Sequence, residues 1–154
     1  MCNRLRRVQR HHARIIKESA AASGIHADIP AMEPPHVLVI EDSASVRRLI
    51  EVCLRVLDVT ISSAADGMEG INAIREREPD MVVLDIGLPG MDGWEVLNQL
   101  RSDTATEHLK VLVLTAHAQP EMADRAAKGG ADAFMTKPFR PLDLREQVEK
   151  LLNM

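Results

Sequence analysis

The chain is built around the stretch MVVLDIGLPGMDG, residues 81–93. Four apolar residues run without a break into Asp85, and a loop rich in glycine and proline follows. A short unbroken apolar run bounded by turn residues is typical of a strand buried on both faces of a sheet. Such a strand delivers its last side chain to the rim of the sheet. Because that side chain is a carboxylate, the sequence points to chemistry at this rim.

The same pattern recurs on both sides of this stretch. Apolar runs that end in polar residues alternate with segments of helical periodicity. The predicted strands are 36–40, 59–63, 79–85, 111–114 and 132–136. The predicted helices are one after a Ser43 cap, then 67–77, 92–100, one from Pro120 to Gly129, and 141–152. Five strands that alternate with five helices indicate a parallel α/β sheet covered on both faces.

The helix after Ser43 carries the clearest apolar face. We expect its inward side chains to be Val46, Leu49, Ile50, Cys53, Leu54 and Leu57. Cys53 belongs to this stripe and is therefore interpreted as a core residue. In the second helix, Ile71 and Ile74 are expected to point inward.

The composition indicates one soluble domain with a modest tail. The chain has 154 residues, of which 45% are hydrophobic. Its two cysteines, Cys2 and Cys53, are far apart, which is typical of a reducing compartment. No apolar run approaches the length of a membrane span, and the Arg-rich start lacks the apolar region of a signal peptide. We therefore expect a cytoplasmic protein.

Charge divides the chain into two parts. Residues 1–35 hold six basic and three acidic residues, a balance of +3, whereas the remainder has a balance of −7. An acidic body is a poor non-specific binder of nucleic acid, so only the tail could be attracted to a polyanion. We interpret 1–35 as a basic N-terminal tail and proline-containing linker, frayed or partly helical over 3–22, and 36–154 as the domain. Met32 is a candidate for the true start.

Polar residues gather at the ends of the predicted strands. They are Glu41, Asp42, Asp85, Thr115 and Lys137. Parallel strands point the same way, so all five lie on one rim of the sheet. Ligands of open α/β sheets bind in the crevice beyond this rim, where the strand order reverses. If the first and third strands flank that crevice, the three carboxylates converge there.

Three carboxylates that face one ammonium group leave a local charge of −2. Two carboxylates about 4 Å apart repel by about 4 kcal/mol at an effective dielectric of about 20, so either a pKa rises or a cation enters. Hard oxygen ligands without Cys or His favour Mg²⁺. An aspartate such as Asp85 can act as a nucleophile and form an aspartyl phosphate. Lys137 and Thr115 would then hold the phosphoryl oxygens.

Each of these residues also has an ordinary structural interpretation. Asp85 could be a turn residue, Glu41 and Asp42 could be a solvated helix cap, Thr115 could cap a helix, and Lys137 could be a surface lysine. Taken singly, the ordinary interpretation is favoured. Their coincidence at the ends of four strands favours a site.

Four motifs carry a family resemblance. VLVIEDS, VVLDIGLPGMDG, VLVLTA and FMTKPF occur in this order, and over about residues 36–152 the chain resembles a receiver domain of the two-component response regulators. The resemblance implies a flavodoxin-like (βα)₅ three-layer sandwich with a parallel five-stranded sheet of order 2-1-3-4-5.

The resemblance also implies roles for individual residues. Asp85 corresponds to the phosphoacceptor, and Glu41 and Asp42 to the acidic pair that binds Mg²⁺. The backbone carbonyl of Gly87 would be a further metal ligand. Gly87 and His117 would flank the phosphoryl group and could tune its hydrolysis, in a direction that the sequence leaves open.

The switch residues follow from the same resemblance. Thr115 corresponds to the hydroxyl that moves to contact the phosphoryl group, and Lys137 to the lysine that pairs with it. Pro138 corresponds to the proline after a cis peptide bond. Phe134 corresponds to the aromatic switch position.

The implied function is that of a stand-alone receiver in a phosphorelay. It would accept a phosphoryl group from a phosphohistidine of a sensor histidine kinase or a histidine phosphotransfer protein. The chain would be a signalling phosphoprotein and not an enzyme, apart from self-catalysed transfer and aspartyl-phosphate hydrolysis. The donor would dock near Ser45, Val46, Arg48 and Leu49. The output target would bind the surface of the fourth helix, fifth strand and fifth helix, with a phosphorylation-dependent homodimer as a further option.

Three other functions compete with this interpretation. A phosphatase with an aspartyl nucleophile usually needs a second Asp two residues after the first, where this chain has Gly87. A flavodoxin-like cofactor binder would need a phosphate loop rich in Ser, Thr and Gly after the first strand, where EDSASVRR is acidic. A regulator that binds nucleic acid through the basic tail would lack a recognition module, because no helix-turn-helix follows residue 152.

Overall fold

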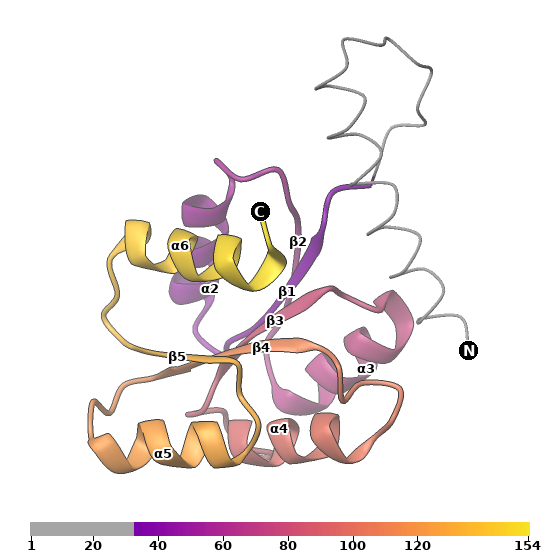
Figure 1. Cartoon of the computed structure of the whole chain (residues 1–154), viewed down its shortest axis with the longest axis vertical. Helices are drawn as coiled ribbons and strands as arrows, with labels where there is room; N and C mark the ends of the chain where they lie inside the picture. The colour runs from indigo at the N-terminus through magenta and orange to yellow at the C-terminus, as the bar shows by residue number, and fades with distance from the viewer. Residues whose placement is uncertain (1–32) are drawn as a thin grey trace, which may run out of the picture. The chain divides into compact units, whose positions relative to one another are not determined.

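A computed structural model of the chain describes residues 33–154, and Figure 1 shows how its elements are arranged. The elements are β1 (His36–Ile40), α2 (Ala44–Leu54), β2 (Thr60–Ala64), α3 (Gly67–Arg77), β3 (Met81–Asp85), α4 (Gly93–Ser102), β4 (Lys110–Thr115), α5 (Pro120–Lys128), β5 (Ala133–Thr136) and α6 (Pro141–Leu152). A compact unit runs from Pro35 to Met154. The interpretation of residues 1–35 as a basic tail and linker, frayed or partly helical over 3–22, falls mostly on residues outside the described part and stays a prediction.

The five strands form one parallel sheet of order β2-β1-β3-β4-β5. This confirms the predicted flavodoxin-like fold and its strand order. The register aligns the carboxyl ends of neighbouring strands, with Ile40 opposite Leu84 and Asp85 opposite Leu114. The side chains that end β1, β3, β4 and β5 therefore lie at one edge of the sheet.

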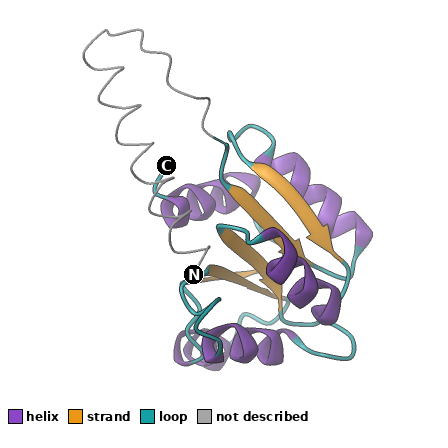
Figure 2. Ribbon diagram, turned by 90° about the vertical axis from the view of Figure 1, so that its right-hand side faces the viewer, coloured by secondary structure: helices purple, strands orange, loops and turns teal. Residues whose placement is uncertain are grey.

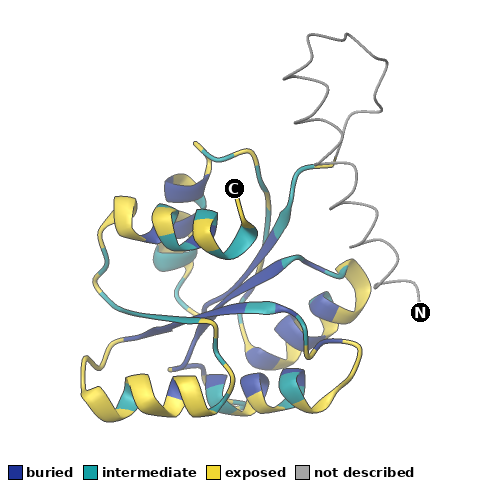
Figure 3. Cartoon of the chain, in the orientation of Figure 1, coloured by how far each residue is buried: buried dark blue, intermediate teal, exposed yellow. Residues whose placement is uncertain are grey.

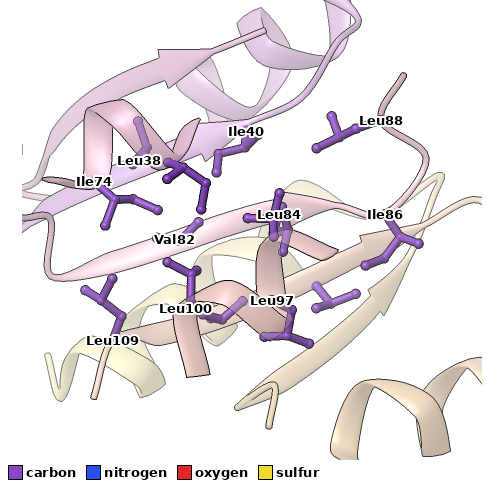
Figure 4. Packing of buried hydrophobic residues seen from close by; sticks show 14 of the residues in the cluster. Leu38, Ile40, Ile74, Val82, Leu84, Ile86, Leu88, Leu97, Leu100 and Leu109 are labelled. Atoms are coloured by element: carbon purple, nitrogen blue, oxygen red, sulfur yellow. The ribbon is translucent and has the colours of Figure 1, made fainter. Parts of the chain in front are cut away.

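Helices cover both faces of the sheet. In Figure 1, α2 and α6 lie on one face and α3, α4 and α5 on the other, and Figure 2 shows the strands between them. Alternate residues of a strand point to opposite faces. In β1, accordingly, Val37 and Val39 pack with the α2 and α6 side, while Leu38 and Ile40 pack with the α3 and α4 side. Figure 4 shows the second of these clusters, which includes Leu84.

The central strand is more buried than the edge strands β2 and β5. All five residues of the central strand β3 are buried, which agrees with the apolar run that predicted it. Figure 3 shows the sheet mostly buried and α5 mostly exposed. Ala126 is the buried residue of α5. Within the described residues, no helix combines the length and the apolarity needed to cross a membrane.

Local sequence signals begin the helices where they were expected. The side chains of Ser43, Asp66 and Asp92 accept hydrogen bonds from the backbone N–H groups three residues later, so each caps a helix. Pro120 and Pro141 occupy the first turns of α5 and α6. A proline costs no hydrogen bond there, because a backbone N–H at this position has no acceptor within the helix.

The bounds of several elements and one core position differ from the sequence expectations. Strand β3 begins at Met81 and not at 79, β4 spans Lys110–Thr115, and β5 begins at Ala133. Strand β2 begins at Thr60 and not at 59, because the Val59 N–H donates to the Leu57 carbonyl in a turn. Leu49 was expected on the inner face of α2, and that was wrong, because its side chain is 47% exposed. Leu49 lies at the margin of the apolar arc, whose centre is Ile50 and Cys53. The core positions predicted for Cys53, Ile71 and Ile74 are confirmed.

Candidate functional site

Four ionisable side chains meet at the carboxyl edge of the sheet. Glu41 and Asp42 follow β1, Asp85 ends β3, and Lys137 follows β5. Glu41 is 1% exposed and Asp85 is 3% exposed, whereas Asp42 faces solvent. Strand register alone brings together residues that are far apart in the sequence. The predicted convergence of carboxylates is therefore present in the fold.

Lys137 lies between two of the carboxylates. Its Nζ atom is 3.2 Å from Oδ1 of Asp85 and 3.3 Å from Oε2 of Glu41. One ammonium group thus contacts two nearly fully buried carboxylates. With Asp42 nearby and all four groups ionised, the local charge is −2.

Burial and crowding shift two pKa values in the absence of metal. Burial, together with a hydrogen bond to Asp85 and the charge of Asp85, raises the pKa of Glu41 from 4.5 to about 7, against the opposing effect of Lys137. Burial alone would lower the pKa of Lys137. The charges of Asp85 and Glu41 outweigh that effect and raise the pKa of Lys137. Lys137 is therefore a permanent cation at neutral pH, while Glu41 is near its midpoint.

The carboxylates fit a divalent cation. Within the described residues, Glu41, Asp42 and Asp85 form a group whose ligand oxygens all lie within 4.8 Å of one another. The donors are hard oxygen atoms, which suit Mg²⁺. Burial first, and then the neighbouring Asp85, raise the pKa of Glu41, and a cation bound here would favour the ionised carboxylate. The acidic group is thus compatible with the magnesium site that the sequence predicts.

Gly87 and Gly93 shape the loop around Asp85. The backbone N–H of Gly87 donates to Oδ1 of Asp85 over 3.1 Å. A Cβ atom at Gly93 would lie 2.5 Å from the Asp85 carbonyl oxygen and 2.6 Å from Cα of Ile86. The start of α4 therefore packs directly on the backbone of the central aspartate. The family resemblance implies that the Gly87 carbonyl is a metal ligand, which stays a prediction, and the sequence gave no sign of the role of Gly93.

The predicted switch residues lie on the two neighbouring strands. Thr115 is 2% exposed, and its Oγ1 accepts a hydrogen bond from the backbone N–H of His117. The backbone N–H of Lys137 donates to the Thr115 carbonyl over 2.7 Å, which fixes the end of β5 beside β4. Phe134 is partly buried against the cluster on the α3 and α4 side. The peptide bond between Lys137 and Pro138 is cis.

Sequence reasoning missed Arg47. Its Nη1 atom donates to the backbone carbonyls of Glu41 and Asp42, over 2.8 Å and 3.1 Å. Nothing in the sequence distinguishes Arg47 from its neighbour Arg48, because both are arginines near the start of the same helix. The difference is visible only once the helix is placed.

The structure thus combines a doubly wound parallel sheet with an acidic group and a lysine at its carboxyl edge. Comparison with known proteins gives its family. The family model for the response regulator receiver domain matches residues 37–149. The chain therefore belongs to the response regulator receiver family of two-component systems. Receiver domains are signalling proteins.

Curated relatives of two lengths match this chain. The chemotaxis protein CheY-3 of Vibrio cholerae is 33% identical over 118 residues, which cover 76% of this chain and 91% of that protein. CheY of Pseudomonas aeruginosa is 34% identical over 118 residues, covering 76% and 95%. The DNA-binding dual master transcriptional regulator RpaA of Synechocystis is 33% identical over 119 residues, covering 77% of this chain and 49% of that protein. The chain thus spans about half the length of the transcriptional regulators that it matches.

Solved structures of receiver proteins share the fold. The chemotaxis response regulator CheY4 of Vibrio cholerae has a TM-score of 0.73 at 27% identity, covering 77% of this chain and 99% of that chain. The receiver domain of Francisella response regulator 1452 has a TM-score of 0.73 at 28% identity, covering 77% and 97%. Both similarities fit the strand order described above.

Proposed function

We propose that this chain is a phosphorylated switch in which Asp85 accepts a phosphoryl group from a phosphohistidine. The observation that carries the proposal is the position of Asp85, which is 3% exposed, contacts Lys137, and shares an acidic group with Glu41 and Asp42. A buried carboxylate with a fixed cation beside it and room for a metal has the groups needed to receive a phosphoryl group. Its donor would be a sensor histidine kinase or a histidine phosphotransfer protein.

The contacts of Asp85 indicate which oxygen reacts. The Gly87 N–H and the Lys137 ammonium both contact Oδ1. We therefore assign Oδ2 as the nucleophile that forms the bond to phosphorus, while the bond from phosphorus to the donor histidine nitrogen breaks and that nitrogen keeps the electron pair. Lys137, 3.2 Å from Oδ1, would stabilise the negative charge that develops on the phosphoryl oxygens. Positioned cations of this kind supply much of the catalysis of phosphoryl transfer.

Glu41, Asp42 and Asp85 would hold Mg²⁺, with the Gly87 carbonyl as a further ligand. A bound Mg²⁺ would neutralise charge on the phosphoryl oxygens. Thr115 would take another of these oxygens, because its hydroxyl accepts from the His117 N–H and keeps its own proton to donate.

The output surface would be the exposed side of α5, β5 and α6. Movement of Thr115 toward a phosphoryl group would draw the end of β4 inward, and Phe134 on β5 would follow. A hollow of about 500 Å³ is lined by residues of β5, of the loop that follows it and of α6, among them Phe134, Pro138 and Phe139. Ala126 is the buried residue of α5, so moving this helix disturbs little apolar packing. Phosphorylation would then act as a population shift of this surface.

The donor protein would dock on the outer face of α2. Ser45 and Arg48 are exposed there, and Leu49 and Val52 are 47% and 49% exposed. Val56, in the turn just after the helix, is 68% exposed. An exposed apolar strip on a helix beside the site suits a helical partner that must bring a phosphohistidine to Asp85. Val46 is half-buried and would contribute at the margin of this face.

Three finer points stay predictions. They are the stand-alone organisation, the cytoplasmic location and a phosphorylation-dependent homodimer. The first stays open because relatives of both lengths match the chain.

The proposed chemistry is self-modification and not turnover of a substrate, with hydrolysis of the aspartyl phosphate as the return step. Gly87 occupies the position at which an aspartyl phosphatase would need a second Asp. No direct contact with DNA is proposed.

The proposal is tested by intact-protein mass after incubation with acetyl phosphate and Mg²⁺. We expect a gain of one phosphoryl group, lost when EDTA replaces Mg²⁺ and absent in Asp85→Asn. The matched control is Asp92→Asn, because Asp92 lies in the same loop but caps α4 by accepting from the Glu95 N–H. This control should still gain the group.

Two results would overturn the proposal. One is a gain of mass that persists in Asp85→Asn. The other is no gain in the wild-type protein with acetyl phosphate and none with a panel of phosphorylated histidine phosphotransfer proteins, while circular dichroism shows that the protein is folded.

A further inference from the structure

Arg47 in α2 reaches back over the loop that carries the acidic pair. Its Nη1 atom donates to the main-chain carbonyl of Glu41 over 2.8 Å and to that of Asp42 over 3.1 Å. The loop between β1 and α2 consists of residues 41–43. One guanidinium nitrogen therefore holds two of the three residues that connect the sheet to the helix.

The two carbonyls need a donor that the helix does not provide. The hydrogen-bond ladder of α2 begins at the cap, where the Arg47 N–H donates to the Ser43 carbonyl. The carbonyls of Glu41 and Asp42 precede this point, so no N–H of the helical ladder reaches them. The contact with the Glu41 carbonyl is partly buried, where an unpaired carbonyl is costly, whereas the contact with the Asp42 carbonyl is exposed. The Arg47 side chain is the partner of both.

The contact leaves the carboxylates available for a cation. An arginine paired with the carboxylate of Glu41 or Asp42 would compete with a metal ion for the same oxygens. Arg47 binds the main-chain oxygens instead, so it fixes the two peptide planes without occupying a metal ligand. The guanidinium group thereby contacts the backbone that carries each carboxylate, while the Ser43 N–H separately donates to Oε1 of Glu41 over 3.4 Å.

We infer that Arg47 is a positioning residue for the divalent cation site, which it preorganises by fixing the backbone of Glu41 and Asp42. The inference rests on the proposed function, because it concerns the magnesium site of that proposal. Groups that orient metal ligands typically change metal affinity by about 10- to 100-fold when they are removed. Arg47 would act in this way through the main chain.

Positioning by Arg47 and the charge of Arg47 predict opposite effects of its removal on Mg²⁺ affinity. Removal of a positive charge near a cation site should tighten Mg²⁺ binding, or leave it unchanged where solvent screens the charge. Arg48 is exposed on the same helix and carries the same charge, so it provides a matched control for this effect. Weaker binding in an Arg47 variant alone can then be assigned to positioning.

The test is calorimetric titration of Mg²⁺ into the wild type, Arg47→Ala, Arg47→Lys and Arg48→Ala, with urea unfolding of each protein in parallel. We expect Arg47→Ala to bind Mg²⁺ at least about tenfold more weakly. Arg48→Ala should equal or exceed the wild type. Arg47→Lys keeps the charge and a donor, and should recover part of the affinity. The unfolding data establish that each variant is folded under the titration conditions.

The outcomes separate this inference from the proposal beneath it. If the wild type does not bind Mg²⁺, the proposed site fails, and with it the role of Arg47. If the wild type binds and Arg47→Ala binds equally or more tightly, the site stands and the positioning role is overturned. Equal weakening in Arg48→Ala also overturns it, because the effect would then not depend on the carbonyl contacts. A loss of stability in Arg47→Ala with unchanged Mg²⁺ affinity would mean that the contact is merely structural.

Discussion

The ammonium nitrogen of Lys137 lies 3.2 Å from Oδ1 of Asp85, and this contact joins the ends of β5 and β3 across the intervening strand β4. Lys137 also lies 3.3 Å from Glu41, so a single cation balances two buried acids. The predictions for this site follow from that balance. Removing one partner of a buried ion pair leaves the charge of the other uncompensated, which destabilises the folded protein.

Replacing Lys137 by Met should destabilise the metal-free protein most at high pH. The change leaves Glu41 and Asp85 facing each other without a cation. Because Lys137 is 20% exposed, we expect a loss of about 1–3 kcal/mol at pH 8, below the range for fully buried pairs. The loss should shrink at pH 5.5, where Glu41 is protonated. Urea unfolding in EDTA measures it, with Lys128→Met on the exposed end of α5 as the control. An equal loss at both pH values would contradict this account.

Replacing Glu41 by Gln should stabilise the metal-free protein at pH 8. The pKa of Glu41 is about 7 in the folded state, above its ordinary 4.5, so the folded state holds the proton more tightly than the unfolded state. The contribution of Glu41 to stability is therefore fully present below about pH 4.5 and is lost as pH rises through 7. Glu41→Gln removes this loss, and we expect a gain of about 1–3 kcal/mol at pH 8 that vanishes near pH 5.

With Mg²⁺ bound, the wild type should be more stable than Glu41→Gln at pH 8, the reverse of the order without metal. Mg²⁺ stabilises the wild type by binding the folded state and should stabilise Glu41→Gln less, because one ligand has lost its charge. Glu76→Gln, on the exposed side of α3, serves as the control and should follow the wild type. If wild-type stability did not decline between pH 5 and pH 8 in EDTA, the raised pKa of Glu41 would be wrong.

Replacing Gly93 by Ala should damage both the fold and the chemistry. The new methyl group would lie 2.5 Å from the Asp85 carbonyl oxygen, and backbone atoms cannot rotate away as a flexible side chain can. We expect the free energy of unfolding to fall by about 1–3 kcal/mol, the usual cost of overpacking. The rate of phosphorylation by acetyl phosphate should fall as well. A variant with wild-type stability and phosphorylation rate would contradict this prediction, because the backbone around Asp85 would then have moved to accommodate the methyl group at little cost.

Replacing Gly87 by Ala provides the contrast. A Cβ atom at Gly87 would lie 3.7 Å and 3.9 Å from the two carboxylate oxygens of Asp85, which is ordinary contact. Stability should therefore change by less than about 0.5 kcal/mol. The methyl group would cover part of the approach of water to the phosphorylated carboxylate, so hydrolysis should slow. The decay of the phosphorylated protein after removal of the donor measures this, and faster decay would contradict the expectation.

Arg101 should matter for stability but not for metal binding. Its guanidinium group donates to the carbonyls of Gly130, Glu107 and Leu109 and to the carboxylate of Asp132. These contacts tie α4 to the start of β4 and to the loop before β5, at the edge of the sheet opposite the site. Arg101→Ala leaves several acceptors unpaired, and we expect a loss of about 2–4 kcal/mol in urea unfolding.

Lys110→Ala is the matched control for Arg101. Lys110 reaches the same Asp132 over 3.8 Å at a more exposed position, so its loss should cost less than about 1 kcal/mol. Mg²⁺ affinity should stay within about twofold of the wild type in both variants, because electrostatic effects across the domain are largely screened. A large change in Mg²⁺ affinity in Arg101→Ala would show that the two edges are coupled.

The main elements of the fold were predictable because local signals agree with the tertiary structure. The apolar run that ends in Asp85 is the central strand, and the caps Ser43, Asp66 and Asp92 begin the helices. Parallel strands place their ends at one edge, so the meeting of Asp85 with Glu41 followed from topology. The strand order itself came from the family resemblance, since periodicity does not specify which strands are neighbours.

The features that could not be predicted depend on contacts between distant segments. Arg47 and Arg48 are alike in sequence, and only the placement of α2 determines which one reaches the carbonyls. Leu49 was assigned to the core because it is apolar and near the stripe, but its position on the helix leaves it exposed. The contacts of Arg101 join segments whose proximity only the folded chain establishes.

The most direct test of the central claim is to locate the phosphoryl group chemically. Borohydride reduces an aspartyl phosphate to homoserine, which peptide mass spectrometry identifies by position. After treatment with acetyl phosphate and Mg²⁺, we predict homoserine at position 85, where the carboxylate is buried beside Lys137. Homoserine at position 42 or 92 with Asp85 unchanged would contradict the assignment of Asp85 as the phosphoacceptor.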